Sequence, residues 1–107
     1  MNRYMPLLFV VLACACGRVA AMTDIEAMEL GYRVAAVKAA LQDPAAPGAM
    51  QAITALGHDQ RYYVMVRGWL MYQLQGDRSL LESSPDQPEL RVRVDFMERA
   101  IRAIDLE

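Results

Sequence analysis

His58 is the residue of this chain best suited to acid–base chemistry, because it is the only histidine and an imidazole exchanges protons near neutral pH. Asp59 and Arg61 follow closely and would complete a minimal polar site. No serine stands in a Gly-x-Ser-x-Gly pattern, and both cysteines, Cys14 and Cys16, precede residue 22, so a zinc site lacks its usual ligands. We therefore expect His58 to be a loop residue. We also expect the chain to have no catalytic residue and to bind no metal or cofactor. An enzyme that uses His58 is the alternative.

A second group combines arginine and aromatic side chains, which dominate the hot spots of protein interfaces. It consists of Arg61, Tyr62, Tyr63, Arg67 and Trp69. One interpretation is an anchor for an acidic ligand or protein. The favoured interpretation of Arg67 is structural, because an arginine at the edge of an apolar helix face often pairs with a carboxylate of a facing helix. Glu29 and Glu98 are the candidate partners, and an arginine that snorkels along the apolar surface is the other structural interpretation.

The helix that must position these side chains covers residues 60–75. Apolar residues fill one broad face and much of the remainder, which indicates a helix that is surrounded or meets a partner. Gly68 is costly in a helix interior, so we expect a close helix crossing there. The helix ends at Gly76, or continues with a kink through Leu80 and Leu81.

Three further apolar side chains of this segment are not easily hidden: Val64, Met65 and Met71. Methionine adapts to irregular surfaces and is frequent at contact sites. If these residues are exposed together, they form a candidate contact surface for a second copy of the chain or for another protein.

The first helix of the predicted domain begins at a capping box formed by Thr23 and Glu26 and stops near Asp43, because Pro44 disfavours helical geometry before it. One apolar stripe consists of Leu30, Val34, Val37 and Leu41. Another consists of Met28, Tyr32, Ala35 and Ala39. Two stripes indicate that this helix touches two neighbours.

A short helix over residues 49–56 and a last helix that starts at Pro88 complete the prediction. Gly57 is expected to end the short helix in the left-handed conformation, and Asp59 to cap the next one. The last helix has the clearest amphipathic stripe, formed by Leu90, Val94, Met97, Ile101 and Ile104.

Residues 1–21 are typical of a secretory signal peptide: Arg3 precedes an apolar run over residues 6–15, and small residues follow before Met22. Ten apolar residues are too few to span a bilayer. The sequence around Cys16 also fits the lipobox of bacterial lipoproteins, so lipidation there is one alternative to cleavage after Ala21. Translation of a cytoplasmic helical dimer from Met22 is another.

Residues 22–107 have room for one domain, which we expect to be an all-α bundle of three to four helices. Arg3 and Arg18 are the two basic residues before Met22, so 9 of the 11 Lys and Arg residues remain against 13 Asp and Glu residues, a formal charge of −4. This charge disfavours binding to nucleic acid. We expect a small periplasmic or secreted accessory protein that binds another protein or itself, with a membrane contact only through a lipid anchor.

Overall fold

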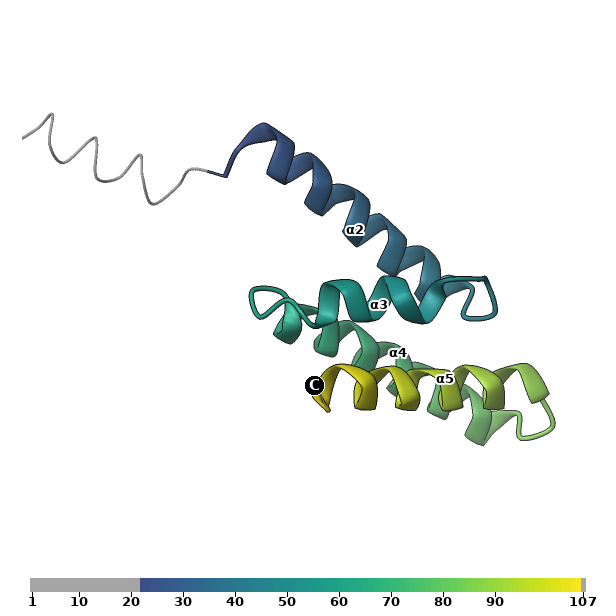
Figure 1. Cartoon of the computed structure of the whole chain (residues 1–107). Coiled ribbons are helices and arrows are strands. Elements are labelled where there is room, and N and C mark those ends of the chain that lie inside the picture. Colours follow the sequence, from purple (N-terminus) through teal and green to yellow (C-terminus); the bar gives the residue numbers. More distant parts are fainter. Residues whose placement is uncertain (1–21, 107) are drawn as a thin grey trace, which may run out of the picture. The chain divides into compact units, whose positions relative to one another are not determined.

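The computed structural model describes residues 22–106, which form four helices and no strand (Figure 1). The helices are α2 (Asp24–Gln42), α3 (Ala49–Gly57), α4 (Tyr63–Ser83) and α5 (Pro88–Asp105). The prediction of an all-helical fold with three to four helices is confirmed for these residues. The predicted signal peptide and Cys16 lie outside them. The chain divides into two units between Leu30 and Gly31, within α2.

Local signals set both ends of α2. The Glu26 amide donates a hydrogen bond to Thr23 Oγ1 at 3.1 Å, as the capping box predicts. Asp24 and Glu26 place acidic groups in the first turn, where the helix dipole favours negative charge. The helix ends at Gln42, shortly before Pro44.

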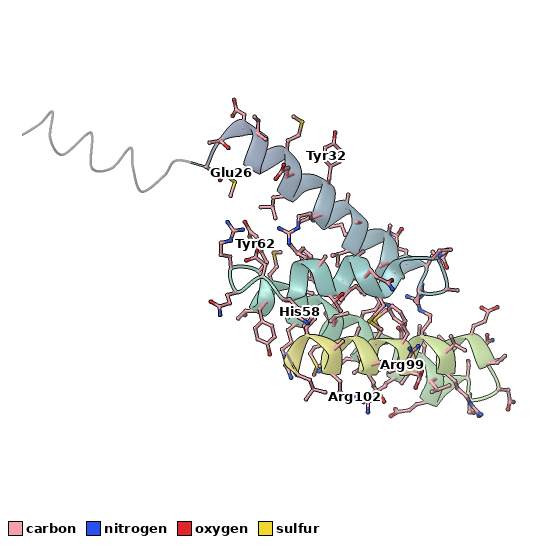
Figure 2. The ribbon with its side chains drawn as sticks, viewed as in Figure 1. Glu26, Tyr32, His58, Tyr62, Arg99 and Arg102 are labelled. Atoms are coloured by element: carbon pink, nitrogen blue, oxygen red, sulfur yellow. The ribbon has the colours of Figure 1, made fainter. Side chains whose placement is uncertain are left out.

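Within the second unit, the two predicted stripes of α2 differ in burial. Val37 and Ala40 are buried, whereas Tyr32 is 72% exposed and Ala35 and Ala39 are also exposed. Figure 2 shows Tyr32 projecting away from α3. Within residues 31–106, the chain therefore covers one side of α2, where the sequence predicts two neighbours.

The short helix α3 starts at a glycine that needs a left-handed backbone. Gly48 has φ 82° and precedes the first helical residue, Ala49. Ile53 and Leu56 are completely buried, as the stripe predicts. Gly57 has no positive φ, so its predicted role as a left-handed terminator is wrong; it is the last residue of α3 and is itself buried.

Helix α4 begins later and ends later than predicted. Residues 58–62 form a turn in which the Asp59 carbonyl accepts hydrogen bonds from the amides of Tyr62 and Tyr63. Tyr62 is the N-cap and makes no side-chain cap, so the prediction that Asp59 caps this helix is wrong. The helix passes through Gly76 to Ser83, because its buried side continues beyond the glycine, through Asp77.

Helices α4 and α5 form an antiparallel pair, and α3 packs against both (Figure 1). Met97, Ile101 and Ile104 of the predicted α5 stripe are buried, and Leu90 and Val94 are half-buried. The core of the second unit thus combines apolar side chains from four helices. Its largest fully buried members are Val37, Ile53, Leu56, Val66, Leu70 and Met97.

Within residues 31–106, the close helix crossing lies at Gly57 and not at the predicted Gly68. A Cβ added to Gly57 would lie 2.5 Å from Ile104 Cγ2 and 3.4 Å from Val66 Cγ1, which leaves no space for a side chain. A Cβ added to Gly68 would meet nothing within 4 Å. Gly57 therefore lets α3 approach α4 and α5 closely, while Gly68 lies on the exposed side of α4.

Candidate binding surface

The structure places the five predicted anchor residues in three different surroundings. Arg61 is exposed in the turn before α4, next to half-buried Tyr62. Tyr63 and Arg67 lie together at the start of α4, where they face the end of α5. Trp69 is half-buried further along α4. The residues therefore do not converge on a single site.

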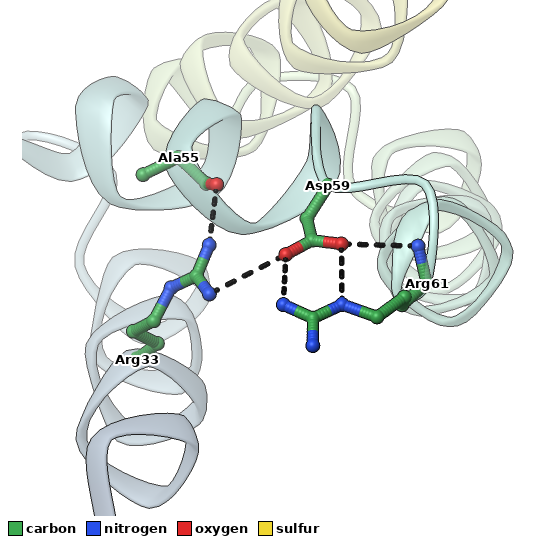
Figure 3. Close-up of polar contacts among 4 residues, drawn as sticks. All are labelled: Arg33, Ala55, Asp59 and Arg61. Carbon is green, nitrogen blue, oxygen red and sulfur yellow. Dashed lines mark hydrogen bonds and ion pairs between the residues drawn. The ribbon is translucent and has the colours of Figure 1, made fainter. Parts of the chain in front are cut away.

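Asp59 is the centre of the turn before α4 (Figure 3). Arg61 binds its carboxylate at both oxygens: Nε donates to Oδ1 at 3.1 Å and Nη2 to Oδ2 at 2.9 Å. Arg33 of α2 lies 3.6 Å from Oδ2 through Nη1 and donates from Nη2 to the Ala55 carbonyl at 2.8 Å. The hydrogen bond from the Arg61 side chain is the main reason that the pKa of Asp59 falls from 3.8 to about 2.

The guanidinium of Arg61 also lies 5.1 Å from the centre of the Tyr62 ring, within the range of a cation–π contact. The backbone amide of Arg61 donates to Asp59 Oδ1 at 3.0 Å, the bond that defines an Asx turn. These contacts fix the conformation of the α3–α4 connection. Arg61 therefore has a structural role in its own turn.

Arg67 and Tyr63 both bind Asp105 at the end of α5. Arg67 donates from Nε to Oδ1 at 3.1 Å and from Nη2 to Oδ2 at 3.2 Å, and the Tyr63 hydroxyl donates to Oδ1. The bonds from Arg67 and then Tyr63 lower the pKa of Asp105, and the bond to Asp105 raises the pKa of Tyr63. A structural ion pair for Arg67 is confirmed, but its partner is Asp105 and not the candidate Glu98; the other candidate, Glu29, belongs to the first unit.

The antiparallel register of α4 and α5 explains this difference. Arg67 lies in the second turn of α4 and therefore faces the last turn of α5, where Asp105 stands. Glu98 lies about two turns earlier and accepts a hydrogen bond from Arg78 Nη2 at 2.9 Å. The sequence therefore predicts that Arg67 forms an ion pair, while the register between α4 and α5 determines that its partner is Asp105.

His58 lies in the turn after α3, as predicted for a loop residue. Its Nε2 donates to the Ala103 carbonyl in the last turn of α5 at 2.8 Å, where carbonyls lack partners within the helix. A recess of about 260 Å³ opens beside it. The recess is lined by Gly57, His58, Gln60, Tyr63, Ile104 and Asp105.

A buried ion pair that the sequence analysis did not identify joins α4 to α5. Asp77 is 3% exposed; its Oδ1 accepts a hydrogen bond from Gln73 at 3.1 Å and its Oδ2 lies 3.4 Å from Arg93 Nε. Arg93 also donates to the carbonyls of Leu41 and Gln42 at 2.7 and 3.1 Å. Arg93 therefore connects three helices. The sequence contains a signal for this pair, because both charged residues fall on a buried helix face. Asp77 follows Leu74 by three residues in α4, and Arg93 precedes Met97 by four residues in α5.

The opposite side of α4 carries an exposed uncharged strip, which we call the outer face of α4. It consists of Val64, Gly68, Tyr72, Gln75 and Gly76. Val64 is 78% exposed and Tyr72 is 81% exposed. Met65 and Met71 are only half-buried. The predicted surface of Val64 and the two methionines is thus partly exposed, and Tyr72, which was not part of it, is the largest exposed side chain of the outer face.

Comparisons with protein-family models, with curated proteins and with solved structures found no match for this chain. None of the helices between residues 22 and 106 combines the length and the apolar character needed to cross a bilayer. The same residues contain no group of three or more His, Cys, Asp or Glu side chains arranged to hold a metal ion.

Proposed function

We propose that this chain is a small exported accessory protein that binds another protein or a second copy of itself and does not act as an enzyme. The observation that carries the proposal is the outer face of α4, on which Val64 and Tyr72 are among the most exposed large apolar side chains of the structure. Exposed apolar side chains that share one helix face are a feature of contact surfaces, and tyrosine is enriched among interface hot spots. A partner that covers this face would remove both side chains from water.

The predicted anchor residues divide into two roles within this proposal. Residues three and four apart are neighbours on a helix surface, so Trp69 lies beside Tyr72 and extends the contact surface. Arg61 and Tyr62 flank its N-terminal end. Tyr63 and Arg67 bind Asp105 and hold α4 on α5, so we assign them a supporting role.

Photo-crosslinking in the native host tests the binding proposal. A benzophenone amino acid in place of Tyr72 changes one exposed aromatic side chain into another and should form a covalent adduct with a protein. The same group in place of Arg91, an exposed residue of α5, is the matched control. An adduct at position 72 and none at position 91 supports the proposal, whereas the absence of any adduct at position 72 contradicts it.

Export is the second part of the proposal, and the order of residues 1–21 supports it: a basic start, a short apolar run and small residues before Met22. The test is a Met22→Leu substitution, followed by cell fractionation and intact mass measurement. If Met1 is the start, the protein is still produced and is found outside the cytoplasm, either beginning at residue 22 or carrying lipid on Cys16. Loss of the product would contradict export, because it would make Met22 the start of translation.

A further inference from the structure

The outer face of α4 contains two glycines that the fold itself does not require. Gly68 and Gly76 lie inside a regular helix without positive φ, and a Cβ added to either would meet nothing within 4 Å. Glycine weakens a helix relative to alanine. Gly57 shows what a required glycine looks like in this chain, because a neighbouring helix occupies the space of its missing Cβ. At Gly68 and Gly76, no residue between 31 and 106 supplies such a neighbour, so the space is open to a partner.

Large and small residues alternate along this face at intervals of four, in the order Val64, Gly68, Tyr72 and Gly76. A second α4 related by a two-fold axis, running in the opposite direction and centred between Gly68 and Tyr72, would reverse this order. Tyr72 of each copy would then face Gly68 of the other, and Val64 would face Gly76. The face is therefore complementary to itself, as a two-fold interface requires.

From this alternation we infer that the partner at the outer face of α4 is a second copy of this chain, packed antiparallel through α4. The inference rests on the proposed function and gives its contact surface a defined occupant. Residues four apart form the ridges that interlock in the commonest class of helix packing. Glycines in the ridge allow the two backbones to approach and the Tyr72 rings to fill the space.

The charge of this face also fits a second copy. A two-fold axis brings like surfaces together, so charged side chains near it would repel their symmetry mates. The five residues of the outer face carry no formal charge. The exposed side of α5 differs, since it carries Glu89, Arg91, Asp95, Arg99 and Arg102.

The size of the face sets the strength of the expected association. Residues 64–76 span about 18 Å of helix, so the contact is smaller than the roughly 800 Å² per partner of a standard stable interface. We therefore expect a dimer that forms reversibly as the concentration rises.

Sedimentation velocity of the protein, produced from the full sequence and purified, tests this inference. The sedimentation coefficient of the wild type should rise with concentration. Gly68→Ala places a methyl group where Tyr72 of the second copy would lie. Because the two-fold axis repeats this contact, the dimer would contain two such clashes, and association should weaken about tenfold or more. Its melting temperature at low concentration should not fall, because alanine favours the helix.

Gly31→Ala is the matched control, because a Cβ at this α2 glycine also meets nothing within 4 Å and lies outside the outer face of α4. It should leave association unchanged. Tyr72→Ser removes the ring from an exposed position and should weaken association as Gly68→Ala does. A wild type that stays monomeric, or a Gly68→Ala variant that associates like the wild type, would overturn the inference. In that case, a photo-crosslinked adduct at position 72 with a different protein would leave the proposed function standing. If no adduct forms at position 72, both the proposed function and this inference fail.

Discussion

The two ends of the α4–α5 pair are held by different kinds of ion pair. Near the turn that joins α4 to α5, Asp77 is buried and Arg93 is half-buried, with side-chain exposures of 4% and 24%. At the open end, Asp105 and Arg67 are exposed to 31% and 41%. The open end also has an apolar crossing at Gly57 and Ile104. The comparison indicates that one end depends on a charge pair removed from water, while the other depends on packing with an exposed charge pair beside it.

The energetic consequences differ because water replaces a lost partner only where it has access. Removing one member of a buried pair leaves an uncompensated charge in a medium that solvates it poorly. Removing one member of an exposed pair leaves a charge that water and ions solvate. The two ends should therefore respond very differently to equivalent substitutions.

The largest effect is expected from Arg93→Met. It leaves Asp77 buried without its cation and leaves the Leu41 and Gln42 carbonyls without their donor, so the free energy of unfolding should fall by about 3 to 5 kcal/mol. Urea denaturation measures this change.

Two variants sharpen this prediction. Asp77→Leu combined with Arg93→Met should recover part of the lost stability, because it removes the unpaired carboxylate as well. Arg91→Ala removes an exposed arginine of the same helix that donates to the Pro85 carbonyl at 2.9 Å, and it should change stability by only about 1 kcal/mol. A loss from Arg93→Met no greater than that from Arg91→Ala would show that the buried pair does not stabilise this end.

The next largest effect is expected from Gly57→Ala at the open end. The new Cβ would overlap Ile104, and forcing a methyl group into a filled core costs about 1 to 3 kcal/mol. Gly68→Ala is the matched control and should instead stabilise the chain by roughly 0.5 to 1 kcal/mol. Opposite signs in thermal melts of dilute samples would confirm that only Gly57 is a packing glycine.

A smaller effect is expected from Arg67→Ala, because water can solvate Asp105 after the guanidinium is removed. The melting temperature should fall by a few degrees at most. Tyr63→Phe removes only the hydroxyl that donates to Asp105 and should have an even smaller effect. A loss as large as that from Arg93→Met would contradict the contrast between the two ends.

The smallest effect concerns pH. The pKa of Asp59 in the fold is about 2 against 3.8 for the free group, so its stabilising contribution is complete above pH 3.8 and is lost as the pH falls through about 2. The pKa of Asp105 is also lowered, which adds a loss in the same direction. Thermal melts across this range should show a weaker pH dependence for Asp59→Asn than for the wild type. If the stability of Asp59→Asn and of the wild type depends equally on pH, Asp59 does not contribute to the acid sensitivity of the fold.

The parts of the fold predicted correctly are those determined within one helix. The capping bond at Thr23, the end of α2 before Pro44 and the buried stripe of α5 follow from helix periodicity and backbone chemistry. The start of α4 was predicted too early because the turn around Asp59 is stabilised by Arg61 and Arg33, and Arg33 comes from a distant helix.

The incorrect predictions share one cause, which is that the register between helices is not a local property. Gly57 and Gly68 are both helical glycines, and they differ in that Ile104 and Val66 lie against Gly57 while nothing described lies against Gly68. Arg67 was identified as an ion-pairing residue, but Asp105 faces it only because α4 and α5 run antiparallel in this register. The sequence does not predict the pair of Asp77 and Arg93, although each residue lies on an apolar stripe. The partner of a charged residue on a buried face can be identified only when the register between the two helices is known.

Arg93 also has a consequence for the local opening of the second unit. Its guanidinium donates hydrogen bonds to the last carbonyls of α2 and forms an ion pair with Asp77 of α4. Fraying of the C-terminal end of α2 would therefore disturb the cation that balances the buried Asp77 carboxylate. Helix ends normally exchange their amide hydrogens fastest. Here the final turn of α2 should resist exchange almost as strongly as the centre of the bundle, which makes this terminus part of the cooperative folding unit.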